Sequence, residues 1–241
     1  CAFLFKPGEY TVDVNVGFYT EVLGLGESPD DTHIIGAVRA EADWMKGNAT
    51  CTFWRSCAGL AVTPTYTDET TERGDNRWSV SQAAPFRRMH IRGNLLLTDN
   101  GWASGGFIAD SVIDGTVDPL GQQQWLSRNS AWKKWINHTG SWNHVFMGVT
   151  HPPEGRWPDV SNTVIEKTPR IREKPFLMID ETGDYFVLVP SPREADSRGV
   201  SWTHGSVPGE KIPLERFYIA RPGEADAESI NAALEEGLNL L

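Results

Sequence analysis

The chain has little cysteine, no long apolar run and fewer basic than acidic residues. Its 241 residues include three cysteines, which are too few for a disulfide framework. No apolar run approaches the roughly 18 residues of a membrane-spanning helix, so we expect no membrane partner. The formal net charge of −10 disfavours a nucleic-acid partner, because binding to a phosphate backbone requires a basic face.

Motifs that hold metals or cofactors are also missing. The six histidines are scattered, and none has a metal-ligand spacing beside a cysteine or an aspartate. The sequence contains no phosphate-binding P-loop, no Gly-x-Gly-x-x-Gly after a strand and no serine nucleophile elbow. We therefore expect no metal and no cofactor. A neutral partner such as a polysaccharide or oligosaccharide is compatible with the acidic charge.

Glycines recur after short apolar runs in the first 150 residues. Their spacing alternates between steps of 22 or 23 and steps of 33 or 34 residues, for Gly36, Gly59, Gly93, Gly115 and Gly148. Self-similarity of this kind is typical of folds built from stacked coils. We predict an all-β fold, a right-handed parallel β-helix, with its rungs in residues 1–150.

The remainder of the chain predicts three further features. Residues 151–224 form an irregular linker that contains a β-hairpin, because two apolar runs at 175–179 and 185–189 flank a glycine-containing turn. A short helix follows Asp226, a favourable N-cap. We expect residues 225–241 to open a second β-helix, so that the chain is the middle of a longer protein whose remaining part is its partner.

The glycines also serve as a ruler along each rung. Residues two before each glycine share one face of a strand and are predicted to point inward: Ile34, Cys57, Ile91, Ile113 and Phe146. Residues five before are predicted to form an outward column: Trp54, Arg88, Asp110 and Asn143. Rungs stack about 4.8 Å apart, so this column would offer a sugar a stacking ring, a carboxyl group and two hydrogen-bonding partners.

The same ruler places Arg92 opposite Asp114 and suggests a catalytic pair. Glycoside hydrolysis needs one protonated and one ionised carboxyl group, and Asp110 and Asp114 are the catalytic candidates. The neighbouring arginines are expected to lower the pKa of both carboxyl groups, which disfavours either as the acid. The alternative interpretation is that the pairs Arg88–Asp110 and Arg92–Asp114 form a structural charge ladder across the rungs and have no catalytic role.

Aromatic and amide side chains supply further candidates. The run 122–125, Gln-Gln-Gln-Trp, predicts either a glycan-lining stretch or an internal amide ladder. The candidate substrate-binding residues are Trp54, Arg88, His90, Arg92, Gln123, Trp125, Arg128, Trp142 and Asn143. A polysaccharide lyase would instead use a base and the arginines, although an acidic protein repels a uronate polymer.

Several segments resemble known β-helix proteins: 3–10, 17–26, 78–85, 104–111, 122–125 and 172–176. They are similar to secreted microbial proteins of the pectate-lyase-like parallel β-helix class, which often carry an attached discoidin-like (coagulation factor 5/8 type) module. The paired-helix layout is similar to that of glycoside hydrolase family 55, the β-1,3-glucanases with two tandem β-helices. No catalytic motif transfers residue by residue, and likeness of fold alone does not establish function.

The resemblance implies a secreted, extracellular enzyme, a glycoside hydrolase that acts on a neutral glycan such as a β-glucan. Two Asn-x-Thr acceptor sequences, at Asn48 and Asn137, are compatible with secretion. The alternatives are a non-catalytic, glycan-binding or adhesive β-helix protein and a polysaccharide lyase.

Overall fold

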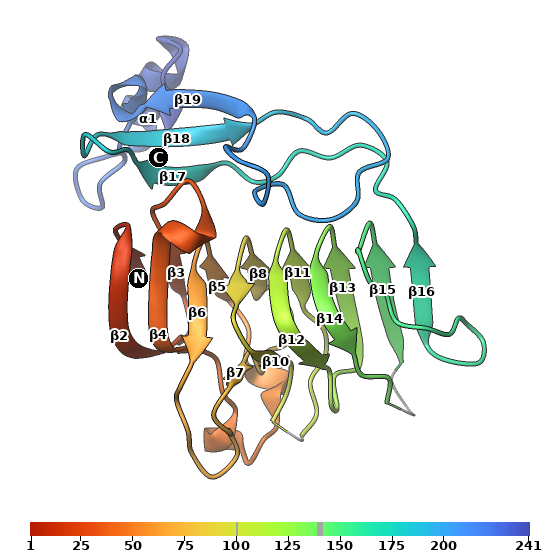
Figure 1. Ribbon diagram of the computed structural model, residues 1–241. Coiled ribbons are helices and arrows are strands. Elements are labelled where there is room, and N and C mark those ends of the chain that lie inside the picture. Colours follow the sequence, from red (N-terminus) through yellow and green to blue (C-terminus); the bar gives the residue numbers. More distant parts are fainter. Residues whose placement is uncertain (100, 139–141) are drawn as a thin grey trace. The chain divides into compact units, whose positions relative to one another are not determined.

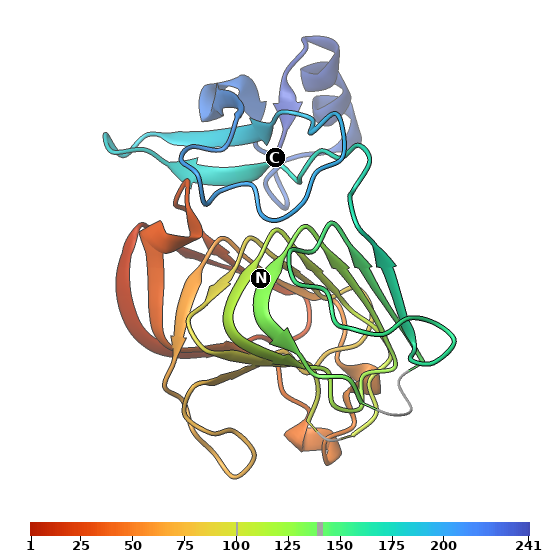
Figure 2. The same ribbon diagram turned by 45° about the vertical axis from the view of Figure 1, so that its right-hand side comes forward.

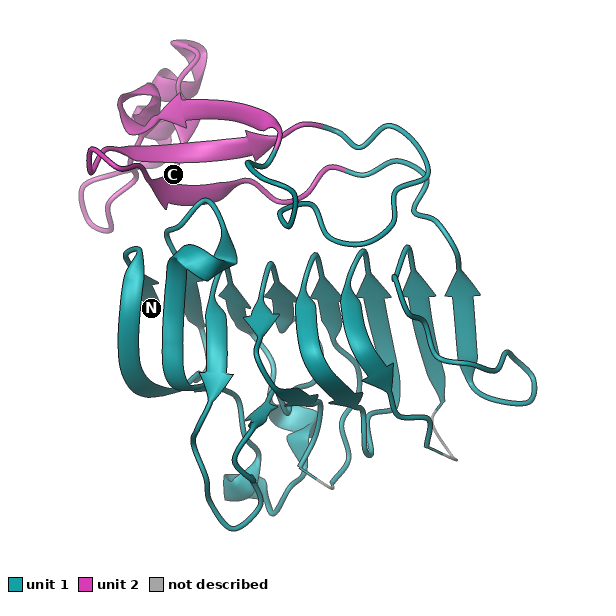
Figure 3. Ribbon diagram, viewed as in Figure 1, with its two compact units in different colours: residues 1–171, 192–207 teal, residues 172–191, 208–241 magenta. Residues whose placement is uncertain are grey.

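The computed structural model describes residues 1–99, 101–138 and 142–241. The chain divides into two compact units, shown in Figure 3. The solenoid unit contains residues 1–171 and 192–207, and the hairpin–helix unit contains residues 172–191 and 208–241. Among the described residues, no helix has the length and apolar character needed to cross a membrane.

The solenoid unit is built from two parallel sheets between which the chain alternates (Figures 1 and 2). Sheet A contains β1 (Ala2–Phe5), β3 (Thr20–Gly24), β5 (Arg55–Ala58), β8 (Pro85–Arg87), β11 (Phe107–Ala109), β13 (Gln124–Arg128), β15 (Asn143–Met147) and β16 (Asn162–Ile165). Sheet B contains β2 (Gly8–Asn15), β4 (Thr32–Arg39), β6 (Ala61–Pro64), β9 (His90–Ile91), β12 (Val112–Asp118), β10 (Asn94–Leu96), β7 (Asp75–Arg77) and, paired with β12, β14 (Ala131–Trp135). The predicted parallel solenoid is confirmed, and its sheet A extends to residue 165.

The core lies between the two sheets, and the predicted inward residues are all in it. Ile34, Cys57, Ile91, Ile113 and Phe146 are each at most 1% exposed. They belong to two files. Strand register aligns Ile34, Val62, Ile91, Ile113 and Trp132 in sheet B. Cys57 aligns with Phe86 in sheet A, and Phe146 belongs to the same sheet.

The glycine column is likewise two features, which corrects the expectation that all five glycines occupy equivalent positions. Gly59 and Gly148 occupy the corner where the chain leaves sheet A, with φ of 73° and 62°. Gly36 and Gly115 lie in strands of sheet B and Gly93 lies between β9 and β10, and a Cβ on each would stand 2.0 to 2.7 Å from a neighbouring carbonyl oxygen. Glycine thus favours a left-handed turn at one position and allows close backbone approach at the other, and the sequence spacing did not distinguish these two positions.

A column of left-handed residues runs along this A-to-B corner. Its members are Gly59, Arg88, Asp110, Asn129 and Gly148, with φ between 46° and 73°. The predicted outward column is therefore wrong in part. Arg88 and Asp110 are neighbours at this corner, whereas Trp54 and Asn143 lie at the opposite corner, where the chain enters β5 and β15. The four residues do not form one surface, because Trp54 and Asn143 were counted from the corner glycines Gly59 and Gly148, whereas Arg88 and Asp110 were counted from glycines of the second kind.

The hairpin–helix unit confirms the two remaining local predictions. β17 (Phe176–Ile179) pairs antiparallel with β18 (Tyr185–Pro190), and β19 (Gly209–Pro213) extends this sheet. Helix α1 (Ala227–Glu235) begins after Asp226, whose carboxylate accepts a hydrogen bond from the Ser229 backbone. The last two strands, β20 (Phe217–Tyr218) and β21 (Asn239–Leu240), pair in parallel.

Among the described residues, the 3-10 helices are η1 (Pro29–Asp31), η2 (Asp43–Met45), η3 (Ala49–Cys51) and η4 (Leu214–Arg216).

Candidate active site

A pocket of about 620 Å³ lies in the solenoid unit beside the outer face of sheet B. Two loops, 26–31 and 201–206, and the strands β9 and β12 form its walls. It is lined by Glu27, Ser28, Asp30, Asp31, His90, Val112, Asp114, Trp202, Thr203, Gly205 and Ser206. We call it the acidic pocket, because four of these side chains are carboxylic acids.

His90 connects two of the acids. Its side chain faces outward because the next residue of β9, Ile91, points into the core. Nδ1 of His90 lies 2.7 Å from an Asp30 carboxylate oxygen, and Nε2 lies 3.1 Å from one of Asp114. Ionised carboxylates only accept hydrogen bonds, so both contacts require either a doubly protonated ring or one protonated carboxyl group. The His90 ring therefore bridges the two carboxyl groups of the pocket.

The loop that carries Asp30 is fixed at several points. Ser28 caps η1, and Asp31 accepts a hydrogen bond from the Ser28 backbone in return. Arg88, at the corner, donates from its guanidinium to the Glu27 carbonyl at 2.6 Å. Asp30 then accepts from Arg92 at 3.0 Å. Burial opposes ionisation of Asp30, but the hydrogen bonds from His90 and Arg92 outweigh it and lower the pKa of Asp30.

The opposite loop is fixed by Asp110, the next residue of the corner column. Its carboxylate accepts hydrogen bonds from the Ser201 backbone at 2.6 Å and from the Ser201 hydroxyl at 2.7 Å. Its carbonyl accepts from the indole N–H of Trp202 at 2.7 Å, and the Trp202 ring centre lies 5.8 Å from that of His90. Asp110 is fully buried and does not line the pocket, so it positions Trp202.

The pKa of Asp110 shifts opposite to the expectation. Burial raises the pKa of Asp110, although the Ser201 hydrogen bonds and the charges of Arg88 and Arg193 act against burial. The sequence reasoning counted the neighbouring arginine and omitted burial, because nothing local reveals that residues 201 and 202 cover this corner.

We predict that Asp110→Ala lowers the free energy of unfolding by about 2–3 kcal/mol, because two Ser201 donors lose their buried acceptor. Asp110→Asn is the matched control and should cost less than about 1 kcal/mol, since the next corner already holds Asn129 at φ 46°. Urea unfolding of both variants measures the difference. Equal stabilities of the two variants would show that these hydrogen bonds do not hold the loop.

The other predicted residues divide between the pocket and distant surfaces. His90 and Asp114 line the pocket, and Arg92 bonds to Asp30, which corrects the expected Arg92–Asp114 pair. Arg128 lies on sheet A with its guanidinium carbon 5.7 Å from the Phe107 ring centre. Strand ends and loops at the B-to-A corner carry the remainder: Trp54, Gln123, Trp125, Trp142 and Asn143.

Most pocket residues escaped the sequence reasoning, among them the two that lie against His90. Asp30 lies 60 residues before His90, and Trp202 lies 92 residues after Asp110. The capping box at Ser28 is a local signal for an ordered loop, although it says nothing about its partner. Trp202 sits in the segment 151–224, which the sequence predicted as an irregular linker with a hairpin, and no local signal marks it.

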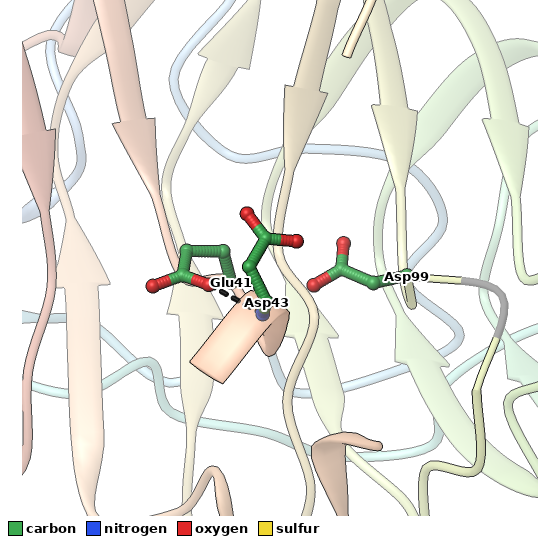
Figure 4. A group of neighbouring side chains, drawn as sticks. All are labelled: Glu41, Asp43 and Asp99. Carbon is green, nitrogen blue, oxygen red and sulfur yellow. Dashed lines mark hydrogen bonds between the residues drawn. The ribbon is translucent and has the colours of Figure 1, made fainter. Parts of the chain in front are cut away.

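Among the described residues, three carboxylates approach closely enough to hold a metal ion: Glu41, Asp43 and Asp99 (Figure 4). The buried Arg77 donates to both Asp43, at 3.1 Å, and Asp99, at 3.2 Å. A side-chain cation therefore already neutralises Asp43 and Asp99, while Glu41 accepts hydrogen bonds from the Asp43 backbone and the Asn15 amide.

The chain was compared with known proteins. No family model matches it. An exo-β-1,3-glucanase of Streptomyces sp. (strain SirexAA-E / ActE) is 50% identical over 243 residues, which cover 100% of this chain and 38% of that protein. The structure of sacteLam55A from Streptomyces sp. SirexAA-E matches with a TM-score of 0.91 and 51% identity, covering 99% of this chain and 42% of that one.

A second solved structure is the E502A variant of sacteLam55A in complex with glucose, with a TM-score of 0.92 and 50% identity. It also covers 99% of this chain and 42% of that chain, so this sequence spans about two fifths of the relatives it matches. Over its whole length the chain is similar in sequence to an exo-β-1,3-glucanase, and its parallel β-solenoid matches the fold of sacteLam55A.

Proposed function

We propose that this chain is part of a glycoside hydrolase of family 55 that acts on a neutral β-glucan, with β-1,3-linked glucan as substrate. The observation that carries the proposal is 50% identity across the whole chain to an exo-β-1,3-glucanase. The glucose complex of the structural relative supports a glucan as ligand. Exo action, the β-1,3 linkage and an attached discoidin-like module belong to the proposal for the whole protein.

The acidic pocket is the place where this chain would offer carboxyl groups to a sugar. Asp30, whose pKa is lowered, suits the ionised role in glycoside hydrolysis. Asp114, hydrogen-bonded to His90, suits the role that holds or releases a proton. Asp110 is a positioning residue in this scheme, because its buried carboxylate is bonded to Ser201.

The pocket favours hydrolysis of a neutral glycan over the lyase alternative. Polysaccharide lyases act on uronates, whose carboxylates would meet Glu27, Asp31 and Asp114 in the same pocket. Like charges repel in so confined a space, and the net charge of −10 adds to this repulsion. The next experiment distinguishes this hydrolase from the other alternative, a non-catalytic glycan-binding protein.

We predict that the protein releases glucose from soluble β-1,3-glucan and that Asp114→Asn lowers kcat/KM by about 100-fold or more, as loss of an acid–base group does. Asp159→Asn is the control and should retain activity, because Asp159 is exposed and does not line the pocket. Sugar release is measured on a panel of neutral glucans.

The possible outcomes test the proposed activity and the role of Asp114 separately. If the parent protein releases no sugar from any neutral glucan, the proposed activity is wrong. If the parent is active and Asp114→Asn keeps full activity, the activity stands and the assignment of Asp114 is wrong.

Secretion and a second β-helix also belong to the proposal. The resemblance to secreted microbial β-helix proteins supports the extracellular location. Asn48 of the first acceptor sequence is half-buried and accepts a hydrogen bond from the Thr50 backbone. The second acceptor sequence includes Thr139, which lies outside the described residues.

A further inference from the structure

The B-to-A corner of the solenoid carries its own column of left-handed residues. Tyr19, Trp54 and Ala83 have φ of 52°, 55° and 55°, and Gly105 has φ of 109°. Strand register places them on successive rungs, because each stands just before the paired strands β3, β5, β8 and β11. The same register continues the column to Gln124 and Asn143, which are direct partners in β13 and β15. We call these six residues the corner strip.

The strip begins with two exposed aromatic rings. Tyr19 is 69% exposed and Trp54 is 50% exposed, and their rings stack with centres 5.3 Å apart and an angle of 24° between their planes. The Tyr19 backbone also donates to the Trp54 carbonyl at 2.7 Å. Left-handed backbone is unfavourable for bulky side chains, and such conformations concentrate at functional sites. The rings therefore form an ordered, solvent-facing aromatic surface.

The middle of the strip is hollow. Ala83 and Gly105 carry little or no side chain, and they line a pocket of about 650 Å³. The remaining lining residues are Gln82, Ala84, Pro85, Ser104, Gly106, Phe107, Gln124, Trp125, Leu126, Asn143 and Val145. None of these residue types is ionisable, although the chain carries a net charge of −10.

Amide groups close the far end of the strip. Gln124 and Asn143 are both exposed, and Gln124 Oε1 lies 3.6 Å from the position that a Cβ on Gly105 would take. An amide thus reaches over the hollow, where it can donate to and accept from a ligand hydroxyl. Aromatic rings, a hollow without charge and two amides follow one another along the solenoid axis.

We propose that the corner strip binds a single chain of neutral glucan, as a second carbohydrate site separate from the acidic pocket. Five steps of one strand spacing give the strip a length of about 24 Å, enough for several consecutive sugar rings. The apolar faces of sugar rings stack on aromatic side chains, and their hydroxyls match the amides. The lack of ionisable lining residues favours a neutral ligand and provides no acid for cleavage. The choice of glucan rests on the proposed function.

The test measures depletion of the protein by insoluble β-1,3-glucan particles. The double variant Tyr19→Ala/Trp54→Ala should bind at least about 10-fold more weakly, because both stacking rings are lost. Alanine is acceptable at this corner, since Ala83 already holds φ 55° on the next rung. Gln124→Ala/Asn143→Ala, at the other end of the strip, is a second variant and should weaken binding by a similar factor. Tyr185→Ala, an exposed tyrosine in the hairpin–helix unit, is the control and should bind like the parent.

Hydrolysis of short soluble oligosaccharides is measured in parallel and should be unchanged in both strip variants. The inference is overturned if the strip variants deplete like the parent, if Tyr185→Ala loses binding to the same extent, or if the parent binds only non-glucan particles or a protein. A parent that binds glucan through the strip and hydrolyses none overturns the proposed activity and supports the strip.

Discussion

Arg77→Met is expected to lower the free energy of unfolding by about 3–5 kcal/mol, the usual cost of removing one partner from a buried ion pair. The Arg77 side chain is 1% exposed and is paired with Asp43, Asp68 and Asp99. Asp99 is equally buried, at 1% exposure, and would keep a carboxylate without its cation. Methionine fills similar space without charge, so the loss measures the ion pairs.

Urea unfolding tests this prediction, with Arg73→Met as the control. Arg73 is exposed and lies in the loop before β7, and its replacement should change stability by less than about 0.5 kcal/mol. Adding Asp99→Asn to Arg77→Met should restore part of the lost stability, because it removes the unpaired buried charge. If Arg77→Met is as stable as Arg73→Met, the cluster does not stabilise the fold.

Acid unfolding is a second test of the ion pairs between Arg77 and Asp43, Asp68 and Asp99. Burial opposes ionisation of Asp68, but hydrogen bonds from Thr70 and Thr71 and the charge of Arg77 lower the pKa of Asp68 to about 2. A lowered pKa stabilises the folded state above the ordinary value of 3.8, and this contribution disappears as the pH falls toward 2. In Arg77→Met, the free energy of unfolding should therefore depend less on pH between about 4 and 2, which acid titration of both proteins measures.

Gly36→Ala is expected to cost about 2–5 kcal/mol, from a steric clash and from backbone strain together. A Cβ on Gly36 would stand 2.0 Å from the Val12 carbonyl oxygen of the neighbouring strand. The φ of Gly36 is +147°, a conformation that residues with a side chain rarely adopt. Both β2 and β4 would have to move apart, and their parallel pairing runs over eight residue pairs.

Gly17→Ala is the matched control for this substitution. Its Cβ would meet only the Thr20 hydroxyl, at 3.9 Å, and the residue is exposed. Thermal unfolding of the two variants should therefore differ by several degrees, with Gly17→Ala close to the parent. A stable Gly36→Ala would mean that the first two coils of sheet B accommodate a wider spacing.

Local patterns predicted the fold well. The alternation around Ile91 and Ile113 identified the core face, because a strand has a side-chain period of two and one face is buried. The hairpin and helix α1 followed from a glycine turn and from the N-cap Asp226 for the same local reason. The step from Gly93 to Gly115 was free of insertions, and it correctly placed Arg88 and Asp110 on adjacent rungs.

The site was predictable only in part, because most of its contacts are distant in sequence. Arg88 and Asp110 were predicted as surface residues that touch a sugar, whereas a left-handed corner directs both toward loops that no local pattern reveals. Trp54 and Asn143 were placed with them, since the sequence does not distinguish a corner glycine from a glycine needed for close backbone approach. The left-handed conformation itself carries a weak signal, in that Asp110 and Asn129 are residue types that tolerate it.

The anchoring of the acidic pocket limits how its dimensions can change. Arg88 holds the loop that carries Asp30, and Asp110, one rung further along the corner, holds the loop that carries Trp202. The backbones of Arg88 and Asp110 are one strand spacing apart, about 4.8 Å, whatever the lengths of the loops. Substitutions or insertions in either loop can change which groups face the ligand. The spacing between the two anchoring residues changes only in whole rungs, when one of them is replaced by an anchor on another coil of the solenoid.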